Sequence, residues 1–313
     1  MRSSCRYHEG QSTEGLEQID HLGVGARAEG EKHLALNYIS AKPEEEEARI
    51  TANVSAVAPI LHIMRHGQGY HSVTENGHDI HDPHLTPEGE EQCRKRRETF
   101  DRHDNIELLL ASPLRRALQT CTITFQPGIE RGLRIIALPM AEEASDAPCD
   151  TGSEVEVLKK EFPDNIDFDN VKHDWYVHEG EYAFEPKALI ARAAKLRRWI
   201  KGRPEKEIAL VSHGFFNHFS TGDVSENGEQ TTPWWGETEL RTFTFVDGPA
   251  FQGDEAERWT VDGEDGAMIK ETEESLERVG ERPHGVTKNI NRPAERARNL
   301  ENFKTDQGPL VLN

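Results

Sequence analysis

The sequence predicts an α/β domain in which a doubly wound, mostly parallel sheet is flanked by helices. Two observations lead to this fold class. Short apolar runs, of the length expected for buried strands of about 4–8 residues, recur through the middle of the 313-residue chain. They alternate with segments whose apolar residues repeat at helical spacing. Such alternation favours parallel strands joined by crossover helices.

Each expected strand is an apolar run bounded by turn-forming or charged residues. Its length is too small for a helix but sufficient for one strand in a sheet covered on both faces. The runs lie at residues 60–64, 106–111, 134–138, 208–211 and 240–246.

The expected helices begin at recognisable start signals. Thr86 is placed to cap a helix that runs to about residue 100, with Pro87 at its first position. Pro113 starts a second helix, and Ser153, with Glu156 three residues later, matches a capping box that begins a short third one. The strongest helical pattern covers residues 186–201; its apolar stripe is Leu189, Ala193, Leu196 and Ile200, and Gly202 follows it as a cap.

The ends of the chain differ in composition from its middle. Residues 1–57 mix Gly, Glu, Ser and Gln without periodicity, which predicts a poorly ordered extension. Residues 58–250 carry the strands and helices of the domain. Within them, about 141–186 form a long insertion, expected to be a lid over the strand ends. Residues 251–313 turn polar again and are expected to be a tail, with some helix over 271–279.

The composition excludes several classes of protein. A formal net charge of −20 argues against a nucleic-acid binder, which needs a basic face. No apolar run approaches the roughly 20 residues of a membrane-spanning helix, and the N-terminus lacks the apolar region of a secretory signal. Four widely spaced cysteines suit neither a zinc site nor a disulfide framework. A cytoplasmic protein is expected, with the nucleus as the other location.

Three motifs follow three of the expected strands. They are RHG at residues 65–67, SPLRRALQT at 112–120 and VSHG at 211–214, with DPHLTPEG at 82–89 between the first two. Ligands of open α/β sheets bind outside the carboxyl ends of the strands, where these motifs lie. The set resembles the histidine phosphatase superfamily, in its phosphoglycerate-mutase-like branch with an RHG motif. The resemblance covers roughly residues 58–250.

The resemblance implies an enzyme that transfers phosphate through histidine. By its motifs, His66 is the nucleophile that becomes a phosphohistidine, and Arg65 and Arg116 bind the phosphate oxygens. A neutral imidazole is available at neutral pH, provided that its other nitrogen is held as a donor, for example by a backbone carbonyl. His213 is expected to be the second imidazole, donating to the phosphoryl group while protonated. No metal ion and no cofactor is expected.

The acid that protonates the leaving group is expected in the acidic segment after the third strand. Glu143 is the first candidate and Asp146 the second, since neighbouring carboxylates raise each other's pKa. Arg115, one position from the phosphate-binding arginine, is expected to face solvent or a distal group of the substrate. His62, which points into the sheet, is expected to be structural. The irregular spacing of His71, His78, His81 and His84 favours loop residues over a metal site.

The chain also departs from the family's pattern. Many members have Glu-Ser after RHG, where this chain has Gln68 and Gly69, and the glycolytic mutases have an R-H-Y-G stretch that is replaced here by residues 144–147. This difference favours hydrolysis of phosphate monoesters, with a small phosphorylated molecule as substrate. The alternatives are a mutase of the same branch and a catalytically silent interaction module. The sequence predicts no oligomeric state.

Overall fold

The computed structural model describes residues 57–162, 164–225, 227–246 and 267–279. The predicted N-terminal extension therefore lies, except for Val57, outside the described residues. Most of the predicted C-terminal tail lies outside them as well. In the part of the chain that the structure describes, no helix combines the length and the apolar content needed to cross a membrane.

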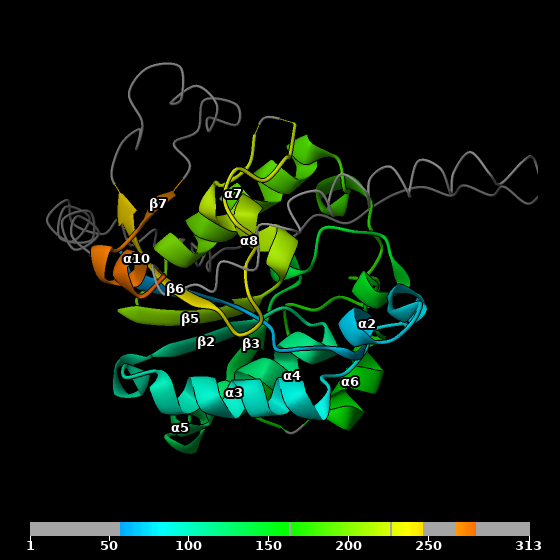
Figure 1. The fold of residues 1–313 in the computed structure, drawn as a ribbon, viewed down its shortest axis with the longest axis horizontal. Helices are drawn as coiled ribbons and strands as arrows, with labels where there is room; N and C mark the ends of the chain where they lie inside the picture. The colour runs from blue at the N-terminus through cyan, green and yellow to red at the C-terminus, as the bar shows by residue number, and fades with distance from the viewer. Residues whose placement is uncertain (1–56, 163, 226, 247–266, 280–313) are drawn as a thin grey trace, which may run out of the picture. The chain divides into compact units, whose positions relative to one another are not determined.

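The predicted α/β sheet is confirmed. In the described residues it has seven strands in the order β4-β3-β2-β5-β1-β6-β7 (Figure 1). Strands β1 to β5 pair in parallel, whereas β6 and β7 are antiparallel. The strands are β1 (Ile60–Arg65), β2 (Leu108–Ala111), β3 (Ile135–Ala137), β4 (Ile166–Asp167), β5 (Glu207–Ser212), β6 (Leu240–Val246) and β7 (Met268–Glu271).

Helices cover both faces of this sheet. Figure 1 shows α3 and α5 along one face and α7 and α8 along the other. The helices are α2 (Tyr70–Val73), α3 (Pro87–Thr99), α4 (Arg115–Thr124), α5 (Gln126–Glu130), α6 (Val155–Glu161), α7 (Pro186–Lys201), α8 (Gly214–Thr221) and α10 (Glu273–Val279). Because side chains alternate along a strand, each central strand supplies both cores: Met64 packs in the core under α4, and Ile63 in the core under α7 and α8.

Two expected helix ends are confirmed at atomic detail. The Thr86 hydroxyl accepts a hydrogen bond from the Gly89 N–H at 3.0 Å, and Pro87 occupies the first position of α3. The C-cap of α7 is Gly202, whose N–H bonds the Arg198 carbonyl. By contrast, α6 begins after Glu154 without a side-chain cap, so the capping role expected for Ser153 is wrong.

The insertion at 141–186 is in part a component of the sheet rather than a lid. It contributes the edge strand β4, and α6 buries Leu158 in the core. Phe168 and Trp175 are buried in the same core. The expectation of a lid is therefore wrong for β4, for α6 and for the buried Phe168 and Trp175. Their apolar side chains pack in the core with residues of β3 and α4.

The expected tail is wrong for residues 267–279. Residues 268–271 form β7, which pairs with β6, and the helix expected at 271–279 is α10, from residue 273. Met268 and Ile269 are buried, and Ile269 packs in the same core as α7. Two buried apolar residues are too few to be recognised as a strand in a sequence that is otherwise polar.

We expect Ile269→Ala to lower the free energy of unfolding by about 2–3 kcal/mol, because it opens a cavity in the core. Leu276→Ala, on the exposed side of α10, is the control and changes it by less than about 0.5 kcal/mol. Urea titration followed by circular dichroism measures both. Equal values for the two variants would mean that β7 is not part of the folded domain.

Candidate active site

The topology brings the three motifs to one edge of the sheet. Strand β5 lies between β1 and β2, and Arg65 is in register with Ser212. The residues that follow these strands therefore emerge side by side: His66 after β1, Ser112 after β2 and His213 after β5. The His66 and His213 rings lie with their centroids 5.1 Å apart. The expected convergence of the two imidazoles is present in the structure.

His66 is held in one tautomer. Its Nδ1 lies 2.7 Å from the Gly67 carbonyl, which can only accept, so Nδ1 carries the proton. The Nε2 atom lies 3.1 Å from Nε of Arg116 and accepts its hydrogen bond, so the lone pair of Nε2 points toward that guanidinium. Burial lowers the pKa of His66 well below its ordinary value, and the neighbouring Arg116 lowers it further. The imidazole of His66 is therefore neutral, with Nδ1 protonated and Nε2 unprotonated.

Arg116 joins the parts of the site. Its side chain is fully buried at the start of α4, and its Nε–H donates to His66. Nη2 lies 3.1 Å from Nδ1 of His213 and 2.7 Å from the carboxylate of Asp150. Nη1 donates to the Cys149 carbonyl at 2.6 Å. A single guanidinium therefore faces both imidazoles while one carboxylate neutralises its charge.

His213 is held between Arg116 and Ser112. Its Nδ1 accepts from Arg116, so its Nε2–H donates to the Ser112 hydroxyl at 2.8 Å. Burial, followed by the charge of Arg116, lowers the pKa of His213 well below 6.5. The ring is neutral in this structure, and its expected donation to a phosphoryl group while protonated stays a prediction.

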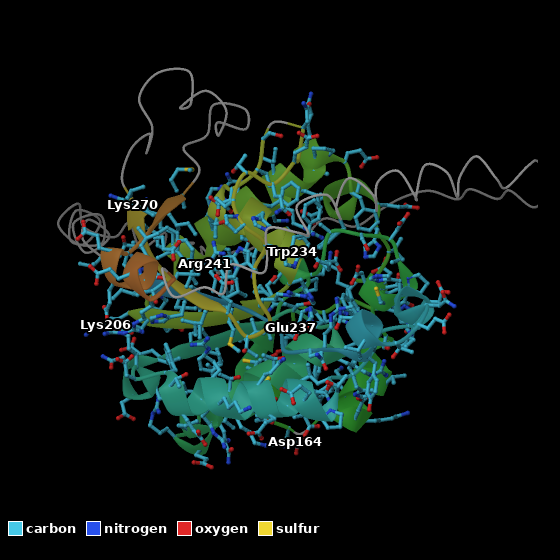
Figure 2. The ribbon with its side chains drawn as sticks, viewed as in Figure 1. Asp164, Lys206, Trp234, Glu237, Arg241 and Lys270 are labelled. Atoms are coloured by element: carbon cyan, nitrogen blue, oxygen red, sulfur yellow. The ribbon has the colours of Figure 1, made fainter. Side chains whose placement is uncertain are left out.

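Arg65 lies at the end of β1 against the loop before β6. Its Nη1 donates to the Trp235 carbonyl at 2.6 Å, and its guanidinium lies 5.9 Å from the centre of the Trp234 ring. Trp234 in turn stacks on Phe215 of α8. Trp234 and Glu237 lie toward the middle of the view in Figure 2, away from Lys206 and Lys270 at the other end of the strands.

Glu143 is buried at the beginning of α8. Its carboxylate accepts the N–H groups of Phe216 at 2.9 Å and Phe215 at 3.3 Å, and that of Ala144 at 3.0 Å. Negative charge at this position also complements the helix dipole. Burial raises the pKa of Glu143, and the charge of Asp150 raises it further.

Among the described residues, neither oxygen of Glu143 lies within hydrogen-bond distance of His66, Arg116 or His213. Asp146, the second candidate, is exposed. The role of Glu143 as the acid stays a prediction, and the contacts it makes are those of a helix cap.

The expectation that Arg115 faces solvent is wrong, because its guanidinium is paired within the protein. Its guanidinium forms an ion pair with Asp82 at 3.1 Å and with Glu161 at 2.8 Å, and it also donates to Ser153. Asp82 has a positive φ of 41° and accepts the backbone N–H groups of Arg115 and Ser153. This cluster fastens the loop after α2 to α4 and α6, so Arg115 has a structural role.

The other histidines considered in the sequence, His62 and the four at 71–84, divide into two groups. His62 is buried between Thr242 and Glu207, and the expected structural role is consistent with these contacts. Of the four histidines considered for a metal site, His78 faces Cys149, His81 bonds the Gly152 carbonyl and His84 pairs with Glu161, while the His71 ring lies 6.4 Å from that of His78 between centroids. Within the described ranges, no group of three or more His, Cys, Asp or Glu side chains is arranged to hold a metal ion.

Sequence reasoning missed three residues of this site. Asp150 pairs with Arg116, Ser112 orients His213, and His71 packs 5.5 Å from His66 between ring centroids. The serine lies in a motif already singled out and was detectable by its place after β2. His71 lies in α2 and Asp150 in a short 3-10 helix, Pro148–Asp150, and their approach depends on how the segments after β1 and β3 fold back over the sheet.

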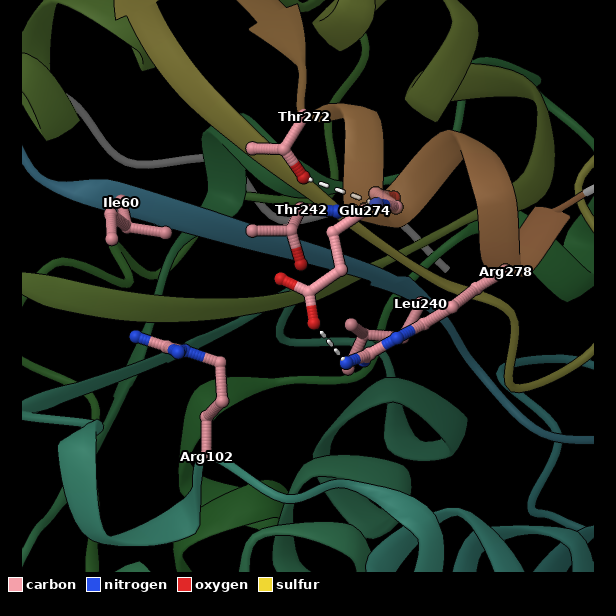
Figure 3. A pocket seen from close by; sticks show the side chains of 8 residues that line it. Ile60, Arg102, Leu240, Thr242, Thr272, Glu274 and Arg278 are labelled. Atoms are coloured by element: carbon pink, nitrogen blue, oxygen red, sulfur yellow. Dashed lines mark hydrogen bonds and ion pairs between the residues drawn. The ribbon is translucent and has the colours of Figure 1, made fainter.

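A cavity of about 120 Å³ lies elsewhere, between α10 and the start of β1 (Figure 3). Its arginines are paired, Arg278 with Glu274 at 2.6 Å and Arg102 with Glu207. Ile60, at the opposite end of β1 from Arg65, lines it. The six residues of β1 place the two ends roughly 17 Å apart, so the cavity is separate from the histidine site.

We expect His66 and His213 to remain neutral at pH 5.5, because both pKa values are lowered by burial. In the unfolded chain both titrate near 6.5 and are mostly protonated at that pH. The unfolded chain thus binds more protons, and these two groups lower the stability as the pH falls below about 6.5. Long-range ¹H–¹⁵N NMR spectra of the imidazoles, with the urea-unfolded protein as control, measure the protonation. Imidazolium signals from both rings at pH 6 would contradict the prediction.

The chain is similar in sequence to curated proteins of two organisms and in fold to solved structures. A probable phosphatase of Schizosaccharomyces pombe is 36% identical over 159 residues, which are 49% of this chain and 73% of that protein. A phosphoglycerate mutase-like protein of Arabidopsis thaliana is 28% identical over 248 residues, covering 65% of this chain and 90% of the relative. Among solved structures, a mycobacterial hydrolase aligns at 16% identity with a TM-score of 0.43, over 69% of this chain and 97% of that one.

The family model of the histidine phosphatase superfamily, branch 1, matches residues 61–248. This match spans more than half of the chain and includes all the motifs that converge on Arg116. The chain therefore belongs to the histidine phosphatase superfamily, branch 1.

Proposed function

We propose that the protein is a phosphatase that hydrolyses phosphate monoesters, without a metal ion, through a phosphohistidine at His66. The observation that carries this proposal is the position of Arg116, which donates to Nε2 of His66 and to Nδ1 of His213. A planar guanidinium between two imidazoles is suited to hold phosphoryl oxygens next to the nucleophile.

In the first step, Nε2 of His66 attacks phosphorus while Arg65 and Arg116 bind the phosphoryl oxygens. The N–P bond forms, and the ester P–O bond breaks with its electron pair on the leaving oxygen. In the second step, water attacks the phosphohistidine and the electron pair of the N–P bond returns to His66. The Gly67 carbonyl holds the Nδ1 proton throughout, so that Nε2 remains the reacting atom.

His213 changes its role when the substrate binds. A phosphate dianion brings negative charge within a few ångströms of the ring, and such charge raises the pKa of an imidazole. His213 then takes up a proton and donates from Nδ1 to a phosphoryl oxygen in place of accepting from Arg116. Its Nε2–H remains on Ser112, which fixes the plane of the ring.

Hydrolysis is favoured over phosphoryl transfer between sugar acids by the sequence of the segment after Glu143. It lacks the R-H-Y-G stretch of the glycolytic mutases and reads Ala-Ser-Asp-Ala. One relative is named a probable phosphatase, and others are named phosphoglycerate mutase-like. A mutase remains the second candidate, and stimulation of activity by a bisphosphate primer distinguishes the two.

We expect His66→Ala to lose at least about 1,000-fold in kcat for a generic aryl phosphate in excess EDTA, because the nucleophile is absent. His173→Ala, at a ring that is 83% exposed, is the control and keeps the wild-type rate. Wild-type protein quenched during turnover is expected to carry an acid-labile phosphoryl group that His66→Ala lacks. Equal rates of His66→Ala and wild type would refute the proposed mechanism.

Arg116→Lys is expected to lower kcat/KM by about 100–1,000-fold, since an ammonium cannot face two imidazoles and a carboxylate at once. The adjacent Arg115→Lys is the matched control. It weakens the Asp82 ion pair and is expected to lower the melting temperature, with less than about a tenfold change in kcat/KM. If the two variants lose activity equally, Arg116 has no special part in phosphate binding.

A further inference from the structure

One buried carboxylate contacts both the phosphate-binding arginine and the segment that carries the expected acid. Asp150 ends the short 3-10 helix Pro148–Asp150, and its Oδ1 lies 2.7 Å from Nη2 of Arg116. Its other oxygen, Oδ2, accepts a hydrogen bond from the hydroxyl of Ser145, two residues after Glu143. A single side chain therefore connects Arg116 to the segment that follows the acid.

The contact with Asp150 orients the guanidinium of Arg116. Nη2 of Arg116 lies between Oδ1 of Asp150 and Nδ1 of His213, and Nη1 donates to the carbonyl of Cys149. Hydrogen bonds between charged groups are about twice as strong as those between neutral ones. The ion pair with Asp150 thus helps to hold the plane of the guanidinium so that its Nε–H reaches His66.

Asp150 and Glu143 are two buried carboxylates with different partners. Asp150 has a guanidinium and a hydroxyl as donors, which stabilise its ionised form. In the described part of the chain, Glu143 is bonded by backbone N–H groups, two at Oε1 and one, from Phe215 at 3.3 Å, at Oε2. Burial raises the pKa of Glu143, the charge of Asp150 raises it further, and the bonds at Oε1 offset this in part. Of the two carboxyl groups, Glu143 therefore keeps its proton to the higher pH, with Oε2 as the less occupied oxygen.

The other charged and titratable groups around Glu143 act less strongly on its proton. Arg116 lowers the pKa of Glu143, but by less than Asp150 raises it. Arg192 of α7 donates to the Glu143 carbonyl at 3.3 Å, and its charge is balanced by Glu142 at 2.8 Å. His213, just before α8, is neutral. Among these groups, Asp150 has the largest electrostatic effect on the acid.

We propose that Asp150 is a positioning residue of the reaction, which orients Arg116 through Oδ1 and holds the segment after the acid Glu143 through Oδ2. The assignment rests on the proposed phosphatase function, with Glu143 as the proton donor. As the ester P–O bond breaks, Glu143 gives its proton to the leaving oxygen, which departs as the alcohol. The carboxylate then takes a proton from the water that attacks the phosphohistidine. The charge of Asp150 keeps Glu143 protonated, and thus able to donate, at a higher pH.

The test is the pH profile of kcat/KM for two substrates of nearly the same shape. The leaving group of 4-nitrophenyl phosphate is stable as an anion, whereas that of phenyl phosphate depends more on protonation. Asp150→Asn keeps the shape of the side chain and removes its charge. We expect the alkaline limb of the phenyl phosphate profile to move down by about one pH unit or more, because Glu143 then loses its proton at a lower pH. The profile of 4-nitrophenyl phosphate is expected to keep its position on the pH axis.

A second variant shows whether Asp150 acts through the acid. We expect Glu143→Gln to lower kcat/KM for phenyl phosphate at least about tenfold more than for 4-nitrophenyl phosphate. In that background, Asp150→Asn is expected to cause no further shift of the alkaline limb. Asp82→Asn is the matched control, since Asp82 is likewise a buried carboxylate and pairs with the adjacent Arg115 at 3.1 Å. It is expected to lower the melting temperature and to leave the limb in place.

Ser145→Ala covers the case in which Asp150→Asn does not fold, because it removes one hydrogen bond and leaves the charge. It is expected to lower kcat/KM for phenyl phosphate about threefold or more relative to 4-nitrophenyl phosphate, without a shift of the limb. An unmoved limb in Asp150→Asn, or equal losses on both substrates in Ser145→Ala, would overturn the assignment. Equal losses in Glu143→Gln would overturn it as well and leave the phosphatase function standing. Wild-type protein that hydrolyses neither ester and forms no phosphoenzyme would overturn the phosphatase function itself.

Discussion

The site depends on one buried cation. Placing a guanidinium in the interior costs several kcal/mol unless its charge is balanced and its N–H groups are bonded. Arg116 meets both conditions: Asp150 balances the charge, and the Cys149 carbonyl and two imidazoles accept hydrogen bonds. The bonds to the two imidazoles leave Nε2 of His66 and Nδ1 of His213 as acceptors facing the guanidinium. The same contacts thus stabilise the buried charge of Arg116 and orient the two imidazoles of the site.

The order of the strands explains why this cation can reach both histidines. Strand β5 lies between β1 and β2, so the residues after three strands distant in sequence share one edge. Helix α4 begins at Arg115, just after β2, and its second residue is Arg116. The Ser112 hydroxyl from the same connection holds His213. The backbone thus brings the two histidines within reach of the one guanidinium of Arg116.

Burial accounts for the protonation states of the charged and titratable groups around this site. The low pKa of His66 and of His213 follows first from burial and then from neighbouring positive charge. The carboxylates respond in the opposite direction: burial raises the pKa of both Glu142 and Glu143. Glu142 is paired with Arg192 of α7 at 2.8 Å, which fastens the segment after β3 to that helix. The neutral imidazoles therefore lie in surroundings whose charges are paired.

The sequence by itself determined the strands and helices with strong periodicity, the edge of the sheet that carries the site, and the residues Arg65, His66, Arg116 and His213. It could do so because apolar spacing and the motifs that follow strands are local in the chain. Only the tertiary structure decided that β7 and β4 extend the sheet, that Arg115 is structural, and that Asp150 and His71 join the site. Most of those contacts link residues more than 20 positions apart, and that of His71 depends on how the chain turns after β1, which no local pattern encodes. It also decided that His213 is neutral in this structure, because a pKa depends on burial and on charges brought near by folding.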